Sequence, residues 1–537
     1  MSNTVAILGA GPSGLVAAKE ALANGLVPTI FEKQAELGGV WNPQTGAVWD
    51  TMRTNISKFT TVYGDRQYPN DTEMFPSSSS VFCYLNDYAD EFKLRDHIKL
   101  QSEVVSVEPV GNEYGASGWH VTWKTNAAST GVLLESQTFQ GVIVATGIFV
   151  KANIPNLPGL STFPGKILHS NEYKTGQEFE GKNVLIIGGS FSGAEIAADV
   201  STHSRQSYHT FRRRFWVLRR YLPDYQERNG SLIPIDLLFY NRKFYSQKST
   251  TNNDEETEEN IIFKKNTNLL SFCQEQQKFE QLKIPKEDFK ISINSVISDN
   301  YLPQVENGSL VPILGAIKEI QGRTVQFQHG QTLLDVDILI FGTGFQMDNS
   351  FFPKAVLDKL KYNPQDGLQP LILFQECFHP DLAGLFFVGM YKGPYFAMME
   401  QQARFACRVL AKIIMLPSKE VTEEGLRKEE EIRNQTFPRP QFPHPEYVSF
   451  VDKMASLGHS FPNLDKLLSP KESLAAAFGQ TRPSGALIMM EHQKAEIARR
   501  FMSEPVTPSH YNFVHSPKQT LNQMDFVQQV LKQFENT

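Results

Sequence analysis

The chain opens on a short apolar run, Val5–Leu8, which is followed by the glycine-rich turn Gly9–Gly14. Residues 15–24 have the composition of a helix, and a second apolar run, Val27–Phe31, ends at Glu32. This order predicts a strand, a turn, a helix and a second strand. Because two strands joined by a helix lie parallel in one sheet, the opening indicates an α/β domain.

The same order of elements recurs in the middle of the chain. The apolar run Val184–Ile187 precedes a second glycine-rich turn, Gly188–Gly193, and residues 194–200 again have a helical composition. Ser207–Phe211 is predicted as the next strand, and the arginines Arg212–Arg214 follow it. The unit occurs twice at long separation, which indicates a duplicated architecture rather than a short-period repeat.

Two later strand patterns, Val142–Gly147 and Ile338–Gly344, each end in small residues. We expect them to return to the two nucleotide sheets. The predicted fold is α/β, with two Rossmann-like dinucleotide-binding domains, the second inserted in the first, plus a helical insertion and a C-terminal segment. The predicted boundaries are 1–160 and 333–445 for the first domain, 161–223 and 306–332 for the second, 224–305 for the insertion, and 446–537 for the C-terminal segment.

The insertion interrupts the α/β pattern. It contains a polar, acidic run at residues 249–260, which we interpret as a solvated surface loop. Residues 425–450 are charged and then proline-rich, which predicts a linker into the C-terminal segment. That segment contains helical stretches and ends in a polar tail, Met524–Thr537.

Composition narrows the class of protein. With 41% hydrophobic and 20% charged residues, the 537-residue chain is expected to fold rather than to be disordered. Its formal net charge of −6 argues against general nucleic-acid binding. No apolar run reaches the roughly 18 residues that span a bilayer. The four cysteines form no Cys-x-x-Cys pair, which excludes dithiol reductases and the common zinc ribbons, and no metal site is expected. With no signal-peptide pattern at the start, we expect a cytoplasmic protein.

The first turn has the residues that a dinucleotide requires. Gly9 allows a tight turn, Gly11 lets the backbone approach a pyrophosphate, and Gly14 lets the helix pack close to the strand. The phosphates would then lie at the helix N-terminus. Glu32, at the tip of the second strand, would accept hydrogen bonds from ribose hydroxyls and repel a 2′-phosphate. The first site therefore suits a dinucleotide with a free ribose 2′-OH, such as FAD.

The second turn differs in two ways. Ser190 occupies the middle glycine position, which leaves less room for a pyrophosphate. Arg212 and Arg213 stand where Glu32 stands in the first unit, and guanidinium groups bind phosphate through charge-assisted contacts. The second site therefore suits NADPH. Two dinucleotide sites in one chain imply electron transfer between them, and dioxygen is the simplest final acceptor.

With these motifs the chain resembles the flavin-containing monooxygenases, within the class B flavoprotein monooxygenases, over nearly its whole length. The sharpest match is Phe163–Lys174, which fits F-x-G-x-x-x-H-x-x-x-Y-K. Tyr173 stands where related Baeyer–Villiger enzymes usually carry Trp, which favours the heteroatom-oxidising branch. Other similar stretches are Gly38–Trp41, Arg53–Lys58, Gly118–Thr122, Asp337–Phe345 and Gln402–Arg404.

The resemblance implies a cycle in which NADPH reduces FAD, the reduced flavin forms a C4a-hydroperoxide with dioxygen, and an oxygen atom passes to an amine nitrogen or a sulfide sulfur of a small molecule. Asn55 is the implied catalytic residue, because its amide could donate to the flavin–oxygen adduct or position NADP. The expected cofactor-binding residues are Gly9, Gly11, Pro12, Ser13, Gly14, Glu32, Lys33, Gly39, Val40, Trp41, Thr54, Asn55, Ile56, Val105, Thr146, Gly147, Gly188, Ser190, Ser192, Gly193, Ala194, Glu195, Arg212, Arg213, Thr343, Gly344 and Gln402.

Three other functions stay open at this point. A Baeyer–Villiger enzyme would oxidise ketones. A single-component flavin halogenase would need a lysine near an aromatic substrate, and Lys243, Lys264 and Lys265 are candidates. A non-catalytic flavin-binding protein is the third. Animal-type relatives often end in a membrane-anchoring apolar helix, whereas the polar tail here predicts a protein without a transmembrane segment. The sequence does not decide whether the chain forms a homodimer.

Overall fold

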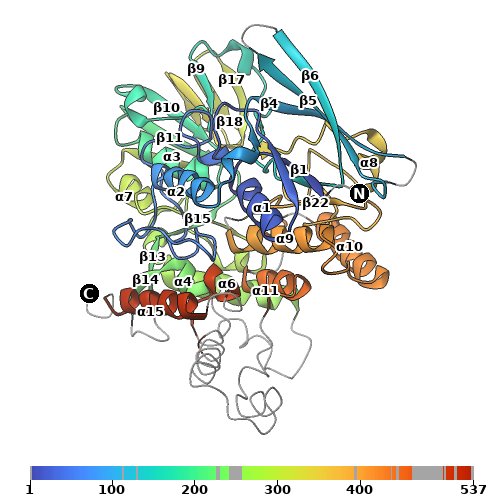
Figure 1. The fold of residues 1–537 in the computed structure, drawn as a ribbon. Coiled ribbons are helices and arrows are strands. Elements are labelled where there is room, and N and C mark those ends of the chain that lie inside the picture. Colours follow the sequence, from blue (N-terminus) through green and yellow to red (C-terminus); the bar gives the residue numbers. More distant parts are fainter. Residues whose placement is uncertain are drawn as a thin grey trace.

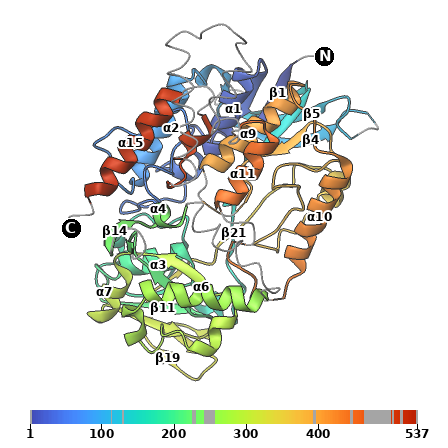
Figure 2. The same ribbon diagram turned by 90° about the horizontal axis from the view of Figure 1, so that it is seen from below.

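The computed structural model describes residues 3–111, 114–127, 131–224, 230–240, 257–391, 393, 396–436, 438–442, 447–461, 500, 504–512 and 517–533. Figures 1 and 2 show two α/β units packed side by side, with the helices of the C-terminal region lying along one side of both. The predicted α/β fold with two dinucleotide-type units is confirmed by the sheet pairing described next.

The first unit is a five-stranded parallel sheet with the order β22-β7-β1-β2-β3. Its core strands are apolar because both faces are buried: Val5 and Ile7 pack on α1 and α9, whereas Ala6 and Leu8 pack on the antiparallel strands described below. Helix α1 follows the first turn and packs against α9. The bounds are β1 Thr4–Leu8, α1 Pro12–Ala23, β2 Val27–Phe31, β3 Ile98–Lys99, β7 Gly141–Val144, β22 Leu385–Phe387 and α9 Phe396–Leu410.

The second unit is a five-stranded parallel sheet with the order β16-β11-β10-β20-β9. The two returning strands expected from the sequence are β7 in the first sheet and β20 in the second. The bounds are β9 Lys166–His169, β10 Asn183–Ile187, α3 Phe191–Val200, β11 Gln206–Phe211, α7 Tyr301–Glu306, β16 Leu310–Leu314 and β20 Ile338–Phe341.

This pairing corrects one of the predicted boundaries. Strand β20 lies after residue 333, yet it pairs with β10 and β9, so the end of the second domain was placed too early. The error arose because hydrogen-bonded partners far apart in sequence leave no local signal. Strand β15, Asn294–Ile297, of the predicted insertion pairs in parallel with β12, Phe215–Leu218, in a separate two-stranded sheet, which ties the insertion to the second unit.

Smaller sheets and helices complete the two units. An antiparallel sheet, β4-β5-β6, extends from the first unit, and β17-β18-β19 extends from the second. Their bounds are β4 Ser102–Pro109, β5 Trp119–Ala127, β6 Gly131–Phe139, β17 Ile317–Gln321, β18 Thr324–Phe327 and β19 Thr332–Leu333. The remaining elements here are α2 Ser78–Glu91, β8 Lys151–Ala152, β21 Phe345–Gln346 and α8 Lys354–Lys359.

The insertion contains the hairpin β13-β14 (Tyr221–Asp224 and Ser231–Pro234) and two helices, α4 (Ile235–Phe239) and α6 (Glu258–Phe272). The predicted acidic loop lies outside the described residues for 249–256. Its last residues, from Glu258 to Asn260, are the first turn of α6 rather than a loop, because the Thr257 side chain caps that helix.

The C-terminal region is more ordered than the linker and polar tail predicted for it. Helix α10, Lys419–Asn434, takes up the first part of the expected linker, and α11, Tyr447–Leu457, packs on α9. Helix α15, Pro517–Gln533, covers much of the predicted polar tail. It buries Met524 and Val527, which lie three residues apart and so share one helix face.

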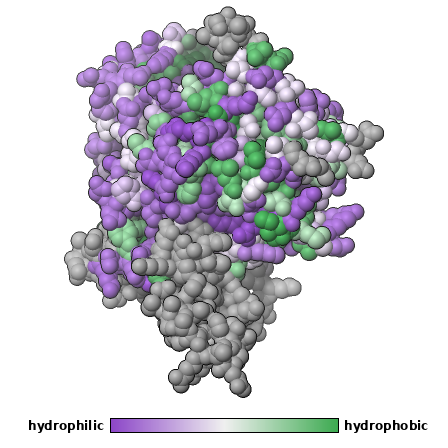
Figure 3. All heavy atoms as spheres, in the orientation of Figure 1, coloured by the Kyte–Doolittle hydropathy of each residue, from purple (hydrophilic) through white to green (hydrophobic). Residues whose placement is uncertain are grey.

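Helix α15 contacts the insertion and the first unit together. Val527 belongs to one hydrophobic cluster with Phe59, Ile233 and Leu237, so α15 lies against α4, as Figure 1 shows. Among the described residues, no helix is both long and apolar enough to cross a membrane. The face drawn in Figure 3 is mainly hydrophilic, and hydrophobic side chains form separate small patches on it.

Candidate functional site

The first turn has a backbone geometry that only glycine allows. Gly9 has a φ of +106°, and a Cβ there would lie 2.7 Å from the carbonyl oxygen of Ala145. A Cβ on Gly14 would lie 1.8 Å from the Gly9 oxygen, so α1 packs directly on β1. Gly39 lies against Gly11, because its Cβ would come within 2.9 Å of the Gly11 Cα. The cradle that the sequence predicts for a pyrophosphate is therefore present.

Glu32 is buried at the carboxyl end of β2 and helps to shape this turn. Its Oε2 accepts a hydrogen bond from Ala10 N at 2.8 Å, and its Oε1 accepts one from Gln34 N at 2.9 Å. Each carboxylate oxygen keeps a lone pair for a ribose hydroxyl, so the carboxylate is held in place for the predicted contact.

The other residues expected at FAD lie at several places around this cradle. Val40 and Trp41 form a short 3-10 helix with Gly39, and Thr146 and Gly147 directly follow β7. Pro12 and Ser13 begin α1. Lys33 is exposed after β2, and Val105 lies at an irregularity in the pairing of β4 with β5.

Gln402 has a different role from the expected cofactor contact. Its amide is fully used inside the protein: Oε1 accepts from Gly389 N at 3.0 Å, and Nε2 donates to the carbonyls of Gln375 and Glu376. A Cβ on Gly389 would lie 2.0 Å from the Ser13 Oγ, so this loop touches the first turn. Gln402 supports the cradle indirectly rather than presenting its amide to a ligand.

The second turn repeats the glycine geometry of the first. Gly188 has a φ of +130°, and its Cβ would lie 2.3 Å from the carbonyl oxygen of Gly342. A Cβ on Gly193 would lie 1.9 Å from the Gly188 oxygen. Ser190, where a glycine was expected, has a φ of −126° and an exposed side chain. Any residue adopts this extended backbone, so Ser190 introduces no strain into the turn.

Two of the arginines that follow β11 are available to an anion. Arg212 and Arg213 are exposed, and neither makes a hydrogen bond or ion pair within the described part of the chain. They lie at the carboxyl end of β11, beside the second turn. Free guanidinium groups at this position fit a 2′-phosphate, whereas Glu32 occupies the matching position in the first unit.

His209 of β11 holds the backbone of the second turn through a hydrogen bond. The sequence analysis did not single out this residue. Its Nε2 donates to the Gly188 carbonyl at 2.8 Å, and its Nδ1 accepts from the Tyr301 hydroxyl at 2.7 Å. Complete burial lowers the pKa of His209 to about 4, so the ring is neutral at physiological pH. The available signal was its spacing: Ser207, His209 and Phe211 share one face of a strand.

The segment Phe163–Lys174, which is the sharpest match to the family, ties the two units together. His169 Nε2 donates to the Gly344 carbonyl at 2.9 Å. The Tyr173 hydroxyl donates to Asp199 of α3, which also accepts from Thr51 of the first unit at 2.8 Å. Lys174 Nζ donates to the carbonyl oxygens of Pro43, Gly46 and Val48 at 3.0–3.2 Å.

Asn55 lies in a segment that passes between the two glycine turns. The side chain is half-buried and makes no hydrogen bond within the described residues. Its neighbours are fixed: Thr54 N donates to Pro76 O at 2.9 Å, and Thr54 Oγ1 donates to Ile56 O at 2.8 Å. Thr54 and Ile56 are therefore buried supports, and Asn55 is the residue of the three with a free polar group.

Arg220, which the sequence did not single out, connects this segment to the second turn. Its Nε donates to Thr54 O at 2.9 Å, and its Nη2 pairs with Glu195 at 2.9 Å. Glu195 and Ala194 directly follow Gly193 in α3. The predicted cofactor contact of Glu195 is not what the geometry favours, because its carboxylate is used by Arg220.

The same segment reaches the first turn at its other end. The Tyr63 hydroxyl donates to Pro12 O at 2.7 Å, and Gly64 N donates to Glu400 Oε2 at 2.9 Å. Asp65 forms an ion pair with Lys19 of α1. Residues 53–65 thus run from the second glycine turn to the first, which places Asn55 between the two predicted dinucleotide sites.

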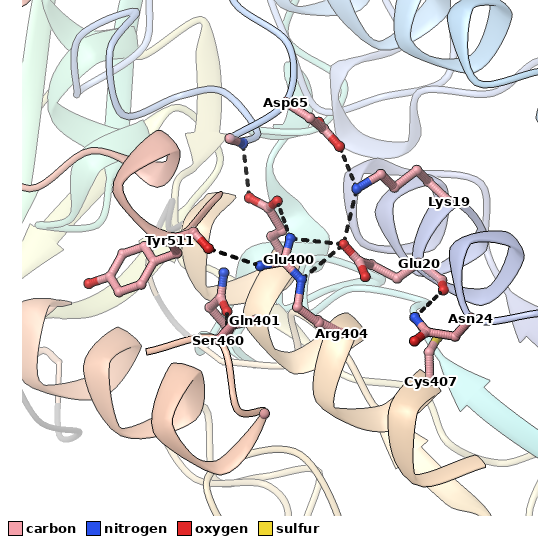
Figure 4. Close-up of polar contacts among 12 residues, drawn as sticks. Lys19, Glu20, Asn24, Asp65, Glu400, Gln401, Arg404, Cys407, Ser460 and Tyr511 are labelled. Atoms are coloured by element: carbon pink, nitrogen blue, oxygen red, sulfur yellow. Dashed lines mark hydrogen bonds and ion pairs between the residues drawn. The ribbon is translucent and has the colours of Figure 1, made fainter. Parts of the chain in front are cut away.

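Behind the first turn, α1 and α9 are joined by a buried charge cluster made of Glu20, Glu400 and Arg404 (Figure 4). Arg404 Nη2 lies 3.0 Å from Glu20 Oε1 and 2.9 Å from Glu400 Oε1, and all three side chains are at most 5% exposed. Burial alone would raise the pKa of Glu20, but the charges of Arg404 and Lys19 outweigh it and lower that pKa to about 2. Burial raises the pKa of Glu400, which shares the same arginine.

Among the described residues there is no group of three or more His, Cys, Asp and Glu side chains that could hold a metal ion. The halogenase candidates Lys264 and Lys265 lie on the exposed face of α6, and Lys243 lies outside the described residues.

The comparisons with known proteins agree with this geometry. The sequence model of the Flavin-binding monooxygenase-like family matches residues 2–501. "Dimethylaniline monooxygenase [N-oxide-forming] 2" of Oryctolagus cuniculus is 27% identical over 500 residues, covering 89% of this chain and 87% of that protein.

Two solved structures share the fold. The S-allyl-L-cysteine S-oxygenase of Allium sativum has a TM-score of 0.57 at 20% identity and covers 99% of both chains. A cyclohexanone monooxygenase mutant from Rhodococcus sp. Phi1, bound to NADP+, has a TM-score of 0.60 at 17% identity and covers 84% of this chain and 97% of that one.

The family match covers most of the chain, including both glycine turns and the Asn55 segment. It confirms the resemblance to the flavin-containing monooxygenases and, with it, the expected cofactors FAD and NADPH. The chain belongs to the Flavin-binding monooxygenase-like family and is a flavin monooxygenase.

Proposed function

We propose that the protein uses NADPH and dioxygen to oxygenate a soft nucleophile, an amine nitrogen or a sulfide sulfur, of a small molecule. The observation that carries this proposal is the placement of Asn55, with a free amide, on a segment that joins the two glycine turns. When bound, FAD accepts a hydride from NADPH and activates dioxygen. In this proposal Asn55 supplies a polar donor between the two predicted sites.

The chain's own residues have separable tasks in this proposal. Gly9, Gly11 and Gly14 let the backbone approach the FAD pyrophosphate, and Glu32 orients its ribose. Arg212 and Arg213 hold the 2′-phosphate of NADPH. No residue is required as a nucleophile or as a general base, because the cofactors supply the redox chemistry.

The choice of an amine or a sulfide rests on two further points. The relative from Oryctolagus cuniculus is named as N-oxide-forming, and the Allium sativum structure is named as an S-oxygenase. Tyr173 stands where Baeyer–Villiger relatives usually carry Trp, and its hydroxyl hydrogen-bonds Asp199 of α3 within the second unit. Halogenation is disfavoured for Lys264 and Lys265, because both lie on an exposed helix face.

The test is product analysis by mass spectrometry with NADPH, air and a mixed panel of a tertiary amine, a thioether, a cyclic ketone and a phenol with bromide. The purified protein should be yellow with about one FAD per chain, and an N-oxide or S-oxide should form. A lactone from the ketone would replace this proposal by Baeyer–Villiger oxidation, and a brominated phenol would replace it by halogenation. If NADPH does not reduce the bound flavin, seen as no loss of its yellow colour, the protein would be a non-catalytic flavin-binding protein.

NADPH should be preferred over NADH, and the double change R212A/R213A should reduce that preference by at least about tenfold. A charge-assisted hydrogen bond contributes about 1.5–3 kcal/mol, and about 1.4 kcal/mol corresponds to tenfold. The measurement is kcat/KM for flavin reduction with each cofactor. Arg205→Ala is the matched control, since Arg205 precedes β11 at the opposite end and contacts Asn183 and Asp337. Equal use of both cofactors by the parent would contradict the assignment.

A further inference from the structure

We propose that Asp236, on helix α4 of the insertion, is a positioning residue that holds the Asn55 segment in the conformation that presents the Asn55 amide to the bound flavin. This inference rests on the proposed function and assigns a task to the insertion. Asp236 touches neither cofactor turn in the structure, and it acts through the backbone and side chains that follow Asn55.

The contacts converge on one carboxylate. Asp236 Oδ1 accepts a hydrogen bond from Ser57 N at 3.0 Å. Its Oδ2 accepts from Ser57 Oγ at 2.7 Å and from Thr60 Oγ1 at 2.6 Å. Asp236 thus accepts three hydrogen bonds, and hydrogen bonds to an ionised carboxylate are charge-assisted and strong. They join positions 179 and 176 residues apart in the chain, so the segment's conformation is set from outside the first unit.

The surroundings keep this carboxylate in place. Asp236 is 2% exposed, while Ser57 and Thr60 are 0% and 1% exposed. Its neighbours on α4 are packed in two clusters: Ile235 lies with Phe75 and Trp216, and Leu237 lies with Val527 of α15 and with Phe59 of the segment itself. Contacts with Trp216 and Val527, which lie outside the segment, therefore hold α4, and Leu237 adds an apolar contact with the segment to the hydrogen bonds of Asp236.

The segment is held on both sides of Asn55 while Asn55 itself stays free. Arg220 binds the Thr54 carbonyl on the N-terminal side, and Asp236 binds the Ser57 amide on the C-terminal side. An amide that must meet charge developing on oxygen has to be placed in advance, because reorganisation during the reaction costs rate. A displacement on the order of 1 Å can cost on the order of 10²-fold.

Burial raises the pKa of the Asp236 carboxyl, whereas the hydrogen bonds from Ser57 and Thr60 lower it, and burial has the larger effect. Holding an ionised carboxylate away from water costs free energy unless hydrogen-bond donors of the protein replace the lost water. The geometry shows those donors in place, and all the side-chain donors come from the segment that carries Asn55. The arrangement therefore couples the insertion to this segment rather than to the protein at large.

The first test compares the holoenzyme with D236A and D236N. FAD per chain and the anaerobic rate of flavin reduction by NADPH should match the parent. Oxygenated product per NADPH should fall about tenfold or more in D236A and less in D236N, which keeps the side-chain shape. Hydrogen peroxide should account for the missing product. A folded D236A that couples as well as the parent overturns the proposal.

Two controls separate positioning from general loss of stability. D366N changes another carboxylate with several donors, the one that binds Arg439 and the amides of Leu368 and Gln369, and it should leave coupling unchanged. The double variant N55A/D236A should be no worse coupled than N55A alone, because both act through one amide. If the double variant instead loses coupling by the product of the two single-variant losses, the two residues act independently and the proposal is overturned. If D236A does not fold, S57A/T60V removes the two hydroxyl donors and should lower coupling in the same direction.

A second readout does not depend on product. In D236A, amide hydrogen exchange should accelerate in peptides covering residues 53–61 and stay at the parental rate in peptides covering the Gly9–Gly14 turn. Parental exchange in both regions would overturn the positioning role. A parent that oxygenates no amine or sulfide would remove the proposed function, and this exchange experiment would still decide whether Asp236 holds the segment.

Discussion

Asn55→Ala should bind FAD and accept hydride from NADPH, yet form about 10²–10³-fold less oxygenated product, a loss of about 3–4 kcal/mol of transition-state stabilisation. In the proposed function, FAD is bound by the Gly9–Gly14 turn and Glu32, to which Asn55 makes no hydrogen bond. Hydride transfer in this proposal depends on NADPH bound at the second turn and its arginines. The Asn55 amide is needed only later, when charge develops on oxygen, so its loss should divert electrons to hydrogen peroxide.

NADPH consumption, hydrogen peroxide and product have to be measured together for this variant. Asn55→Asp keeps the size but replaces the donor by a carboxylate, and it should be coupled no better than the alanine variant. Asn307→Ala is the matched control: this exposed amide of the second unit hydrogen-bonds Gln304 and Ser309, its near neighbours in the chain. If Asn55→Ala consumes NADPH normally and stays coupled, another group stabilises the oxygen and Asn55 has a structural role.

The two glycine turns could be predicted from the sequence because their chemistry is local. A tight turn, a close helix and a charged strand end lie within about 25 residues of each other, and glycine is required where a Cβ would strike backbone. For the same reason the exposed arginines after β11 could be located from the sequence, and their contact with a phosphate stays a prediction. Ser190 departs from the expected glycine, and its extended backbone accepts serine without strain, whereas the smaller room for a pyrophosphate stays a prediction.

The residues that hold the Asn55 segment could not be predicted, because their partners are remote. Arg220 and Asp236 meet Thr54 and Ser57 across 166 and 179 positions, and no periodicity links them. Glu195 was assigned to a cofactor because it follows a glycine turn, whereas the fold gives it to Arg220. Helix α15 shows the same limit: its polar composition hid Val527, which is buried against α4.

One predicted domain boundary was wrong for a related reason. Strand β20 looks like the end of the second nucleotide unit by its own pattern, but the boundary at 333 separated it from its partners β10 and β9. Parallel strands join through long crossovers, so membership of a sheet depends on contacts that a local pattern does not contain. Pairing, rather than sequence spacing, defines where the second unit ends.

Arg404→Met should destabilise the protein by about 3–5 kcal/mol at neutral pH, the usual cost of breaking a buried ion pair from one side. Arg404 serves both Glu20 and Glu400, so its loss leaves two buried carboxylates with too few partners. Glu20→Gln should cost less, because Arg404 keeps Glu400 as its counter-ion. The measurement is the denaturant midpoint of the FAD-loaded protein, with Arg427→Met as control, since Arg427 bridges Glu424 and Glu431 on an exposed helix face and should be neutral.

The stability difference between the parent and Arg404→Met should also depend on pH. In the parent, the Glu20 pKa is about 2, below its ordinary 4.5, so its contribution to stability is full above pH 4.5 and is lost as the pH falls toward 2. Without Arg404, burial dominates and raises the pKa of the buried carboxyls, so the variant gains stability as the pH falls and they take up protons. The difference between parent and variant should therefore shrink from pH 7.5 to pH 5. A constant difference over that range would mean that Arg404 stabilises the α1–α9 contact through packing rather than charge.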